Sequence, residues 1–379
     1  MKVAIDISPL KSAHQFRGVG SYTKRLVEAL QLIKVPNFSF QLIEEGKIPD
    51  DCDIVHYPYF DLFFLTLPLR KSKPTVVTIH DVTPLVFPQH FPPGIKGKIK
   101  FQIQKLSLKG VKAVITDSKN SKKDIANWLA YPKEKIYVIP LAPGKEFKKL
   151  EIGNKQSLLL HNWKLEIKEK YRLPETFLLY VGDVNYNKNI PGLIRAFKQI
   201  HTSEVSPRLW RGPSTSEVGL VLVGKAFTDE SLIETRKILQ LIKALNLNNQ
   251  IKILGWVSDK DLPMIYNLAT VYCQPSFYEG FGLPVLEAMA CGCPVVAANT
   301  SSLPEVCGKA AVMVNPYDIN DIANGLEKVI RETKIRNTLK EKGLVWVKNF
   351  SWEKAANQTI KVYQNVYQEN KHSLLLRNK

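Results

Sequence analysis

The sequence has no long apolar run. Its longest mainly apolar stretch, residues 62–69, is far short of the roughly 20 residues that a membrane-spanning helix needs. At the amino terminus, MKVAIDISPL has Asp6 where an export signal would need an uninterrupted apolar core, so no export signal is expected. We therefore expect a cytoplasmic protein, whose contact with a membrane, if any, is peripheral and at the inner face.

Cysteine and acidic residues are also scarce. Five cysteines, an odd number, favour reduced thiols and a cytoplasmic setting. Cys291 and Cys293 form a CxC without a second pair, which disfavours a structural metal site because zinc needs four ligands. The 35 acidic residues are outnumbered by 53 lysines and arginines, and the formal net charge is +18. An anionic partner is expected: nucleic acid, a phospholipid surface or a phosphorylated substrate.

The chain is long enough for two domains, and its pattern predicts their class. At 379 residues, with 45% hydrophobic and 23% charged residues, it has the composition of a globular protein. Short β-rich runs alternate with helical patterns, which predicts an α/β protein with two Rossmann-like, doubly wound domains. The expected strands are residues 3–7, 38–43, 53–57, 75–79, 113–116 and 136–139 in the first half, and 177–181, 219–223, 251–254, 271–274, 294–297 and 311–314 in the second.

The boundaries between the domains are also expected from composition. Residues 146–174 are polar, rich in lysine and without a clear strand, which indicates a connection between a domain at 1–145 and another at 175–350. The sequence TSEV occurs at 202–205 and again at 215–218, and the segment between these repeats is interpreted as a surface insertion without a chemical role.

Residues that follow the strands are the best site candidates, because ligands of such sheets bind beyond the carboxyl ends of strands. In EGFGLPVLE, glycines and a proline force a turn between Glu279 and Glu287, so Glu279 lies on a loop and Glu287 in the opening turn of a helix. The N–H groups of the loop and of the helix start would face one anion-sized site. Glu287 could then accept both ribose hydroxyls of a nucleotide, or merely complement the helix dipole.

Other candidates leave two interpretations open. Lys188, in the loop after strand 177–181, could neutralise a leaving diphosphate or be a solvated side chain. Gly18 and Gly20 form a GxG that opens a helix capped by Ser21 or Thr23, and they lack the third glycine of a dinucleotide fingerprint. His80, at a strand end, is either hydrogen-bonded structure or a substrate contact.

Two further patterns, a DxD motif and an apolar helical stripe, also have a structural and a functional interpretation. Asp51 and Asp53 form a DxD that could hold a cation, but they precede a strand, so a polar loop is favoured. A helical stripe with interspersed lysines fits core packing about as well as it fits binding to anionic lipid. That stripe is formed by Ile95, Ile99, Ile103 and Leu106. No aromatic residues alternate with the lysines, which disfavours nucleic acid as the partner.

The chain resembles a known family over nearly its whole length. The most specific segment is EGFGLPVLEAMACGCPVV, with two glutamates separated by seven residues, and SSLPEVCGKAAVMVNPYDINDIANGL, TIHDVTP, ITDSKNSKKDI and NFSWEKAANQTIKVYQNV are also similar. These segments resemble the family 4 retaining glycosyltransferases of the GT-B fold, group 1, and in particular bacterial mannosyltransferases and rhamnosyltransferases. The resemblance implies that the last helix, about 351–370, packs back on the amino-terminal domain.

The resemblance also implies roles for the candidate residues. A nucleotide-diphosphate sugar would bind to the carboxyl-terminal domain and an acceptor to the amino-terminal one, and GT-B enzymes usually need no metal. The implied catalytic residues are Glu279, His80 and Lys188, with Glu279 and His80 near the sugar. The implied donor-binding residues are Gly18, Gly20, Gly182, Lys188, Phe281, Gly282, Leu283 and Glu287, with backbone N–H groups of 281–283 and Lys188 at the diphosphate.

One departure concerns the cations of the donor loop. Many relatives have arginine where this chain has Asp183, and some have arginine in place of Asn187. Either Asp183 faces away from the site, or Lys225 or Arg17 compensates. The expected activity is transfer of a hexose, with mannose and GDP-mannose favoured over a UDP-sugar, to a glycan or lipid-linked acceptor in surface polysaccharide or glycolipid synthesis. The alternatives are a GT-B epimerase or phosphorylase, or a non-enzymatic polyanion-binding protein.

Overall fold

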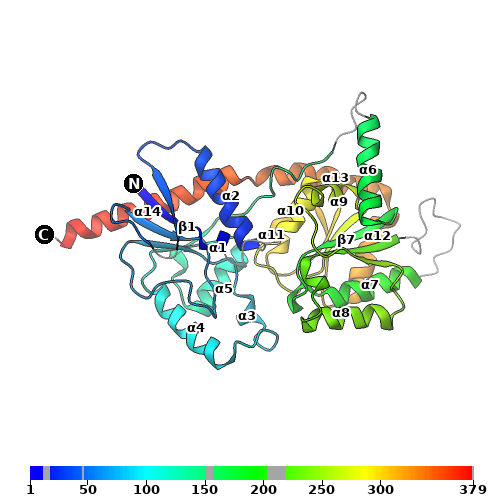
Figure 1. Cartoon of the computed structure of the whole chain (residues 1–379), viewed down its shortest axis with the longest axis horizontal. Coiled ribbons are helices and arrows are strands. Elements are labelled where there is room, and N and C mark those ends of the chain that lie inside the picture. Colours follow the sequence, from blue (N-terminus) through cyan, green and yellow to red (C-terminus); the bar gives the residue numbers. More distant parts are fainter. Residues whose placement is uncertain (12–17, 45–46, 151–156, 203–217, 378–379) are drawn as a thin grey trace. The chain divides into compact units, whose positions relative to one another are not determined.

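The chain forms two compact units, each built on one parallel sheet. The computed structural model describes residues 1–11, 18–44, 47–150, 157–202 and 218–377. The first unit consists of Met1–Ala142 with Phe350–Lys379, and the second of Pro143–Asn349. Each has a six-stranded sheet with helices packed against it (Figure 1). The predicted α/β class with two doubly wound domains is confirmed.

In the first unit, the strand order is β2-β1-β3-β4-β5-β6, and all neighbours are parallel. The strands are β1 (Lys2–Asp6), β2 (Ser39–Ile43), β3 (Ile54–Tyr57), β4 (Thr75–Thr78), β5 (Ala113–Thr116) and β6 (Ile136–Val138). Strands β3, β4 and β5 are buried along their whole length, as expected for a parallel sheet covered on both faces. The chain leaves β1 for β2 on one side and later places β3 on the other, so strand order reverses between β1 and β3.

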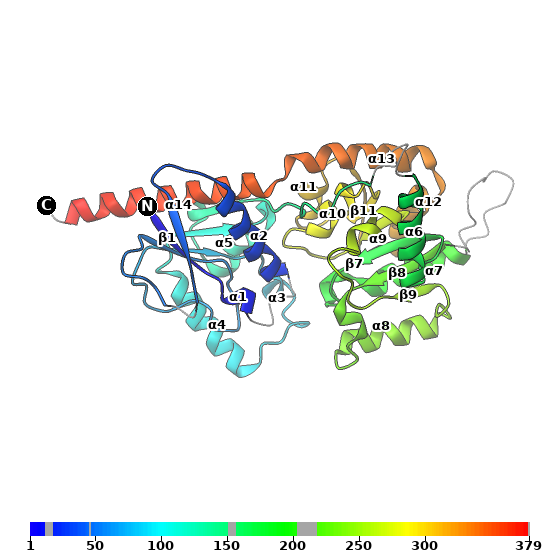
Figure 2. The ribbon, with the colours of Figure 1, turned by 45° about the horizontal axis from the view of Figure 1, so that its top comes forward.

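The helices of the first unit are α1 (Ser8–Lys11), α2 (Gly18–Leu32), α3 (Thr83–Val86), α4 (Gly94–Leu108), α5 (Lys119–Leu129) and α14 (Trp352–Arg377). Helix α14 lies alongside α2 and also contacts β3 and β5 (Figure 2). Helix α2 already includes Gly18, so the predicted cap at Ser21 or Thr23 is wrong. The Thr23 hydroxyl instead donates to the Val19 carbonyl inside the helix, at 3.0 Å.

In the second unit, the strand order is β12-β11-β10-β7-β8-β9. The strands are β7 (Thr176–Val181), β8 (Val218–Val223), β9 (Ile251–Ile253), β10 (Val271–Gln274), β11 (Val295–Ala298) and β12 (Ala311–Val314). Here the order reverses between β7 and β10, which pair directly, with Tyr272 opposite Leu179. Ligands of doubly wound sheets bind at such a reversal, so the structure draws attention to the loops after β7 and β10.

The helices of the second unit are α6 (Ser157–Tyr171), α7 (Ile190–Thr202), α8 (Ile233–Ala244), α9 (Leu262–Leu268), α10 (Leu283–Ala290), α11 (Leu303–Cys307), α12 (Ile319–Arg331) and α13 (Thr333–Trp346). Helix α7 contacts α8 and α12, whereas α10 contacts α9, α11 and α13. Helix α6 lies within the expected interdomain connection 146–174, yet it belongs to the second unit and contacts α9. The length of the connection was overestimated because most residues of α6 are polar, and Ile167, which is buried in the second unit, gave no clear signal in the sequence.

The structure tests the interpretation of the stripe on α4 but not that of the TSEV insertion. The segment between the TSEV repeats lies outside the described residues. The helical stripe on α4 is not core, because Ile95, Ile99 and Leu106 are 81%, 58% and 55% exposed. Of the helices in the described part of the chain, none is long and apolar enough to cross a bilayer.

Candidate functional site

Two predicted site residues of the second unit meet where its strand order reverses. Lys188 ends a short 3-10 turn, Tyr186–Lys188, in the loop after β7, and Glu279 lies in the loop after β10. The Lys188 ammonium lies 2.7 Å and 2.9 Å from the two carboxylate oxygens of Glu279. The pair joins residues 91 apart in the sequence, so the neighbouring strands, not local geometry, bring them together.

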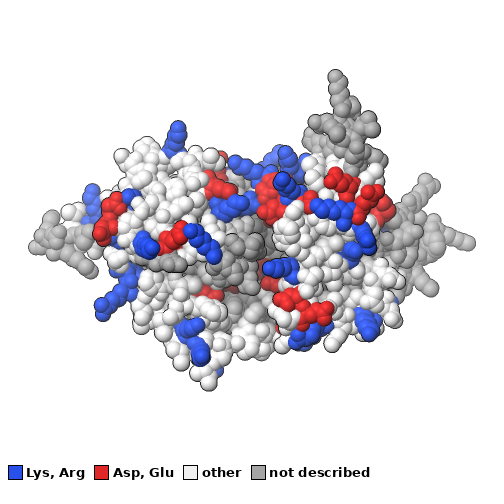
Figure 3. Space-filling view, viewed as in Figure 1, with Lys and Arg blue, Asp and Glu red and all other residues white. Residues whose placement is uncertain are grey.

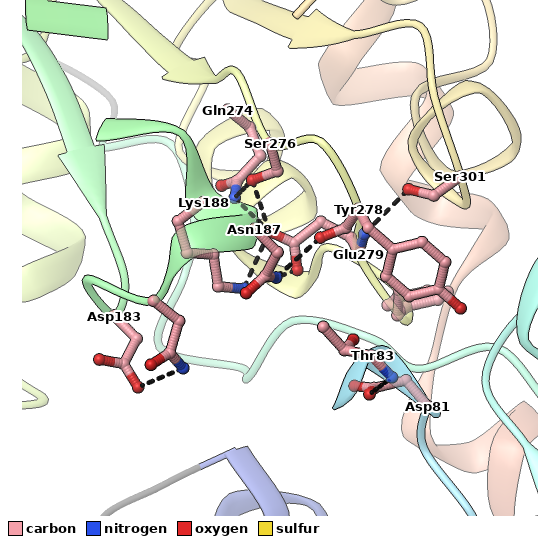
Figure 4. A network of polar contacts seen from close by, with 12 residues as sticks. Asp81, Thr83, Asp183, Asn187, Lys188, Gln274, Ser276, Tyr278, Glu279 and Ser301 are labelled. Carbon is pink, nitrogen blue, oxygen red and sulfur yellow. Dashed lines mark hydrogen bonds and ion pairs between the residues drawn. The ribbon is translucent and has the colours of Figure 1, made fainter. Parts of the chain in front are cut away.

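The Glu279 carboxylate is almost fully enclosed by donors (Figure 4). Its side chain is only 8% exposed. Besides Lys188, its Oε1 accepts from Gln274 Nε2 at 2.6 Å and from the Ser276 hydroxyl at 2.7 Å. Charge-assisted hydrogen bonds of this kind are short and hold a buried carboxylate in a fixed orientation. Because the donors fix its orientation, Glu279 offers a preorganised negative charge beside a cation.

Two asparagines hold the loop after β7 against the loop after β10. The Asn187 side-chain amide donates to the Tyr278 carbonyl at 2.9 Å, and the backbone carbonyl of Asn187 accepts from the Phe277 N–H at 2.8 Å. Asn189 has a left-handed backbone (φ 53°), and its amide donates to the Pro275 carbonyl at 3.1 Å. These residues flank Lys188 and set its position. Neither asparagine was predicted as a structural support, although a left-handed asparagine before a helix is a recognisable turn signal.

The turn between Glu279 and α10 requires glycine and is held by serines. Gly282 has φ 100°, and a Cβ there would lie 2.7 Å from the Leu303 side chain. The buried Ser302 hydroxyl lies 2.9 Å from the Glu279 carbonyl and 2.8 Å from the Phe281 carbonyl, so its proton is shared between them. The Ser301 hydroxyl accepts from the Glu279 N–H at 2.9 Å. The turn is therefore fixed before any ligand binds.

Glu287 lies further along α10 than predicted. It is the fifth residue of the helix, in the second turn, so its placement in the opening turn is corrected. The helix begins one residue before Pro284, and this shifts the glutamate out of the first turn. Its carboxylate accepts from the Tyr266 hydroxyl at 3.2 Å. Burial and the Glu287 charge raise the pKa of Tyr266 well above its usual value, so the phenol remains a donor that orients Glu287.

Gly182 and Asp183 satisfy local contacts in the loop after β7. A Cβ on Gly182 would lie 2.7 Å from the Tyr180 hydroxyl, which donates to the Asp183 carbonyl at 2.8 Å. The Asp183 carboxylate accepts from the Val184 N–H at 2.8 Å and from Asn185 at 3.3 Å. The acid thus stabilises its own turn. Of its possible compensating cations, Lys225 begins the segment after β8, and Arg17 lies outside the described residues.

In the first unit, His80 forms a buried pair that its motif did not reveal. Its Nδ1 lies 2.7 Å from the carboxylate of Asp117, which follows the neighbouring strand β5. The ring edge meets the Tyr22 ring at a centroid distance of 4.6 Å. Burial opposes protonation of His80, but the charges of Asp117 and Asp81 more than offset it, and its pKa is raised. Within the described residues, His80 Nε2 and Asp117 Oδ1 are buried without a hydrogen-bond partner.

The remaining candidates differ in their surroundings. A Cβ on Gly18, the first residue of α2, would meet nothing within 4 Å, whereas Gly20 is buried inside that helix. Asp53 accepts from the Lys2 N–H at 2.7 Å and Asp51 pairs with the Lys2 side chain, so the DxD is structural, as favoured from the sequence. Within the described ranges, no group of three or more His, Cys, Asp or Glu side chains is arranged to hold a metal ion.

Comparison with known families assigns both parts of the chain. Residues 161–346 match the family described as Glycosyl transferases group 1. Residues 25–142 match Glycosyltransferase Family 4. The two matches fall on the second and first units respectively, and both belong to the same class of enzyme.

Individual relatives agree with this assignment. The chain is 32% identical over 314 residues to an O-antigen chain mannosyltransferase B of Escherichia coli, an alignment covering 82% of this chain and 74% of that one. It is 29% identical over 299 residues to the serotype-specific mannosyltransferase WbdA of Escherichia coli, which covers 78% of this chain but only 34% of that longer protein. A sucrose-phosphate synthase structure from Thermosynechococcus elongatus shares the fold, with a TM-score of 0.72 at 20% identity, covering 97% of this chain and 100% of the other. The chain therefore belongs to the family 4, group 1 glycosyltransferases, and its two units have the GT-B fold.

Proposed function

We propose that this glycosyltransferase moves a hexose, with mannose favoured, from a nucleotide-diphosphate sugar to a glycan or lipid-linked acceptor in surface polysaccharide or glycolipid synthesis. GDP-mannose is favoured over a UDP-sugar as donor, because relatives similar over most of this chain are named mannosyltransferases. The observation that carries the proposal is the Lys188–Glu279 pair beside a glycine turn that opens a helix, at the strand reversal of the second unit.

The diphosphate is proposed to bind at the start of α10. Pro284 has no N–H, and the Val285 N–H donates to the Gly282 carbonyl at 3.0 Å, so neither residue supplies a donor to an anion. The N–H groups of residues 281–283 are proposed as the donors. The helix dipole adds partial positive charge there. Lys188 supplies a full charge that stabilises the leaving diphosphate without protonating it. The reaction proposed here accordingly needs no metal cofactor.

Glu287 is proposed to accept the ribose hydroxyls and Glu279 to contact the donor sugar. Transfer breaks the bond between the anomeric carbon and the diphosphate oxygen and forms a bond to an acceptor oxygen, whose proton is released. The proposed outcome is retention of the anomeric configuration. Gly18 and Gly20 are proposed to leave clearance for the donor, Gly182 to shape its loop, and His80 to contact the reacting sugar.

Donor binding is tested by replacing Glu287 with alanine. Thermal unfolding of the wild-type protein should shift upward with rising concentration of GDP-mannose, because a ligand of the native state stabilises it by about 2.7 kcal/mol at 100 times Kd. The Glu287→Ala variant should lose this shift. Glu341→Ala, which changes an exposed glutamate on α13, should keep it. An unchanged response in Glu287→Ala, or no response of the wild type to any of the UDP, GDP, CDP and dTDP sugars, contradicts the proposal.

Peripheral contact with an anionic membrane, at its cytoplasmic face, is also proposed. Core packing does not explain the apolar stripe on α4, because most of its residues are exposed. Helix α4 and the residue after it contain no acid and carry Lys96, Lys98, Lys100, Lys105 and Lys109. In Figure 3, lysine or arginine side chains project from otherwise uncharged surface at the end of the first unit where Figure 1 labels α4. Exposed apolar side chains among lysines fit an interface with anionic lipid.

Sedimentation with vesicles measures this contact. The protein should sediment with vesicles that contain phosphatidylglycerol and much less with phosphatidylcholine alone, and added salt should weaken the binding. Replacing both Ile95 and Ile99 with serine should reduce the bound fraction severalfold. Replacing the exposed Leu32 of α2 with serine is the matched control and should change little. Equal sedimentation of the double variant and the wild type rules out this surface.

A further inference from the structure

The first unit contains a pocket that none of the proposed donor contacts uses. Its volume is about 780 Å³. Asp6 and Tyr57, the last residues of β1 and β3, both line it. It therefore lies at the carboxyl edge of the sheet where strand order reverses, the place where doubly wound sheets bind ligands. Pockets of roughly 300–1,000 Å³ are the usual size for small-molecule sites.

The wall of this pocket is mainly aliphatic. Loop residues Leu65, Leu67 and Leu69 line it, together with Ile103 from α4. Leu65 and Leu69 are 57% and 54% exposed, which is unusual for leucines at the edge of a pocket and leaves their apolar surface uncovered. Sugars and nucleotides would gain little from such a wall, whereas a hydrocarbon chain would bury it and its own surface together.

The loop that forms this wall is held in place without a ligand. The fully buried Gln104 of α4 donates to the Thr66 hydroxyl at 2.8 Å and accepts from the Leu67 N–H at 3.3 Å. At the other end of the loop, the Lys71 ammonium donates to the Ser107 carbonyl at 2.7 Å, near the carboxyl end of α4. Burial lowers the pKa of Lys71 to about 8. These bonds hold the loop so that Leu67 is buried while Leu65 and Leu69 stay exposed at the pocket edge.

One cation completes the pocket. Arg70 lines it and is exposed, and no described residue forms a hydrogen bond or ion pair with it. The other charged groups of the lining are already engaged, since Asp6 accepts from the Ser8 N–H at 3.1 Å and Lys71 binds carbonyls. A guanidinium at the edge of an aliphatic pocket matches a phosphate attached to a hydrocarbon chain.

We propose that this pocket binds the hydrocarbon chain and adjoining phosphate of a lipid-linked acceptor. The inference rests on the proposed transfer to such an acceptor and gives it a site: the chain lies against Leu65, Leu69 and Ile103, and the phosphate meets Arg70. Ile103 belongs to the stripe of α4 whose other members, Ile95, Ile99 and Leu106, are exposed, so a unit docked on a membrane through α4 could take the chain from the bilayer.

Binding of farnesyl phosphate to the full chain tests the proposal by calorimetric titration below its micelle concentration. Each buried methylene should tighten binding about fourfold. Farnesyl phosphate should therefore bind at least about tenfold more tightly than geranyl phosphate, and inorganic phosphate should not bind measurably. Arg70→Gln should weaken farnesyl phosphate binding severalfold and leave the affinity for farnesol unchanged.

Two pocket variants and one matched control complete the experiment. Ile103→Ser and, as a second variant that alters only an exposed side chain, Leu69→Gln should each weaken farnesyl phosphate binding about tenfold. Leu32→Ser changes an exposed leucine of α2 that does not line the pocket, and the variant should bind farnesyl phosphate like the wild type. Affinity that is independent of chain length, or an equal loss in Leu32→Ser, contradicts the proposed pocket. The thermal response to GDP-mannose is measured in parallel. If this response is intact while farnesyl phosphate fails to bind, only the proposed lipid pocket is contradicted. If the response is absent while affinity still depends on chain length, the proposed donor is contradicted.

Discussion

At the scale of single residues, the site depends on one buried ion pair. Taking a carboxylate out of water is costly unless its oxygens are fully hydrogen-bonded and paired. Glu279 meets this condition through Lys188, Gln274 and Ser276, all within 2.9 Å. The same contacts hold the lysine at the site before a diphosphate arrives. Structure and proposed chemistry therefore depend on the same atoms.

Removing the cation should affect both stability and binding. Lys188→Met leaves Glu279 buried without its counter-ion, so the free energy of unfolding of the second unit should fall by about 3 kcal/mol. Donor affinity should fall as well, because the diphosphate loses its neutralising charge. Urea denaturation with and without GDP-mannose measures both effects. Lys237→Met, on the exposed surface of α8, serves as control, and equal stability of the two variants would show that the pair contributes little.

The charge of Asp117 should set the titration of His80. The carboxylate 2.7 Å from the ring favours the imidazolium, and the pKa of His80 is raised despite burial. Asp117→Asn removes that charge while keeping the shape, so the pKa of His80 should fall below that in the wild type. Proton-detected NMR of the labelled imidazole across pH 5 to 9 measures the shift. A titration that is unchanged in the variant would mean that another group controls His80.

At the scale of elements, two helices begin at glycines for different reasons. Gly282, before α10, has φ 100° and almost no room for a side chain. Gly18 opens α2 with open space around it, so nothing in the described part of the chain explains a missing side chain there. The first glycine is required by the fold, whereas no contact with the described residues requires the second.

Gly282→Ala should destabilise the second unit. A left-handed backbone costs a non-glycine residue roughly 1–2 kcal/mol, and the contact with Leu303 adds to this cost. The turn should also move, which weakens donor binding beyond the loss of stability. Chemical denaturation and the thermal response to GDP-mannose report these two effects. Full donor affinity in a destabilised variant would show that the turn is not part of the donor site.

Gly18→Ala separates a ligand role from a structural one. Because the helix accepts alanine without strain, the variant should be as stable as the wild type or more stable by about 0.4–1 kcal/mol. If Gly18 gives the donor clearance, transfer should nevertheless slow at least tenfold. Comparing the unfolding midpoint with the initial rate of GDP release from GDP-mannose in the presence of an acceptor tests this. A stable variant with unchanged rate removes Gly18 from the site.

At the scale of the whole molecule, a buried hydrogen-bond chain ties the last helix to the first sheet. The Tyr363 hydroxyl of α14 lies 2.7 Å from His56 Nδ1, and His56 Nε2 lies 2.9 Å from the Thr78 hydroxyl. Thr78 in turn lies 3.1 Å from the hydroxyl of Tyr22, whose ring touches His80. Residues 307 apart thus share one fully buried contact. The carboxyl-terminal segment is an integral part of the first unit.

His56 should make the first unit sensitive to acid. Burial lowers the pKa of His56 from 6.5 to about 3. Between these two pH values, His56 is therefore protonated in the unfolded chain and neutral in the folded chain. Stability from this group is complete above pH 6.5 and is lost as pH falls towards 3. Between pH 7 and pH 5 the loss should be about 2 kcal/mol. Urea denaturation at both pH values measures it, and His56→Gln should show a smaller loss by that amount. An equal pH dependence in the variant would assign the acid sensitivity to other groups.

The strands, their alternation with helices and the family motif could all be read from the amino-acid sequence alone. Fully buried parallel strands appear as continuous runs of buried residue types, so 113–116 and 271–274 were predicted to the residue. The half-buried strand 311–314 was also predicted to the residue. The two glutamates and the glycine turn were also visible, because turn chemistry is local. The sequence likewise suggested Lys188 and Glu279 as site residues one by one, though not as a pair.

Which of these residues contact one another, and which helix faces are buried, depends on the packing of the folded chain. Lys188 reaches Glu279, and Asp117 reaches His80, because neighbouring strands place their loops together, and strand order is not encoded in any local pattern. An apolar stripe of helical period has the same sequence whether it faces a core or solvent, so the exposure of Ile95 on α4 could not be predicted. Local sequence sets backbone propensity and periodicity, whereas ion pairs and burial depend on packing between segments far apart in the chain.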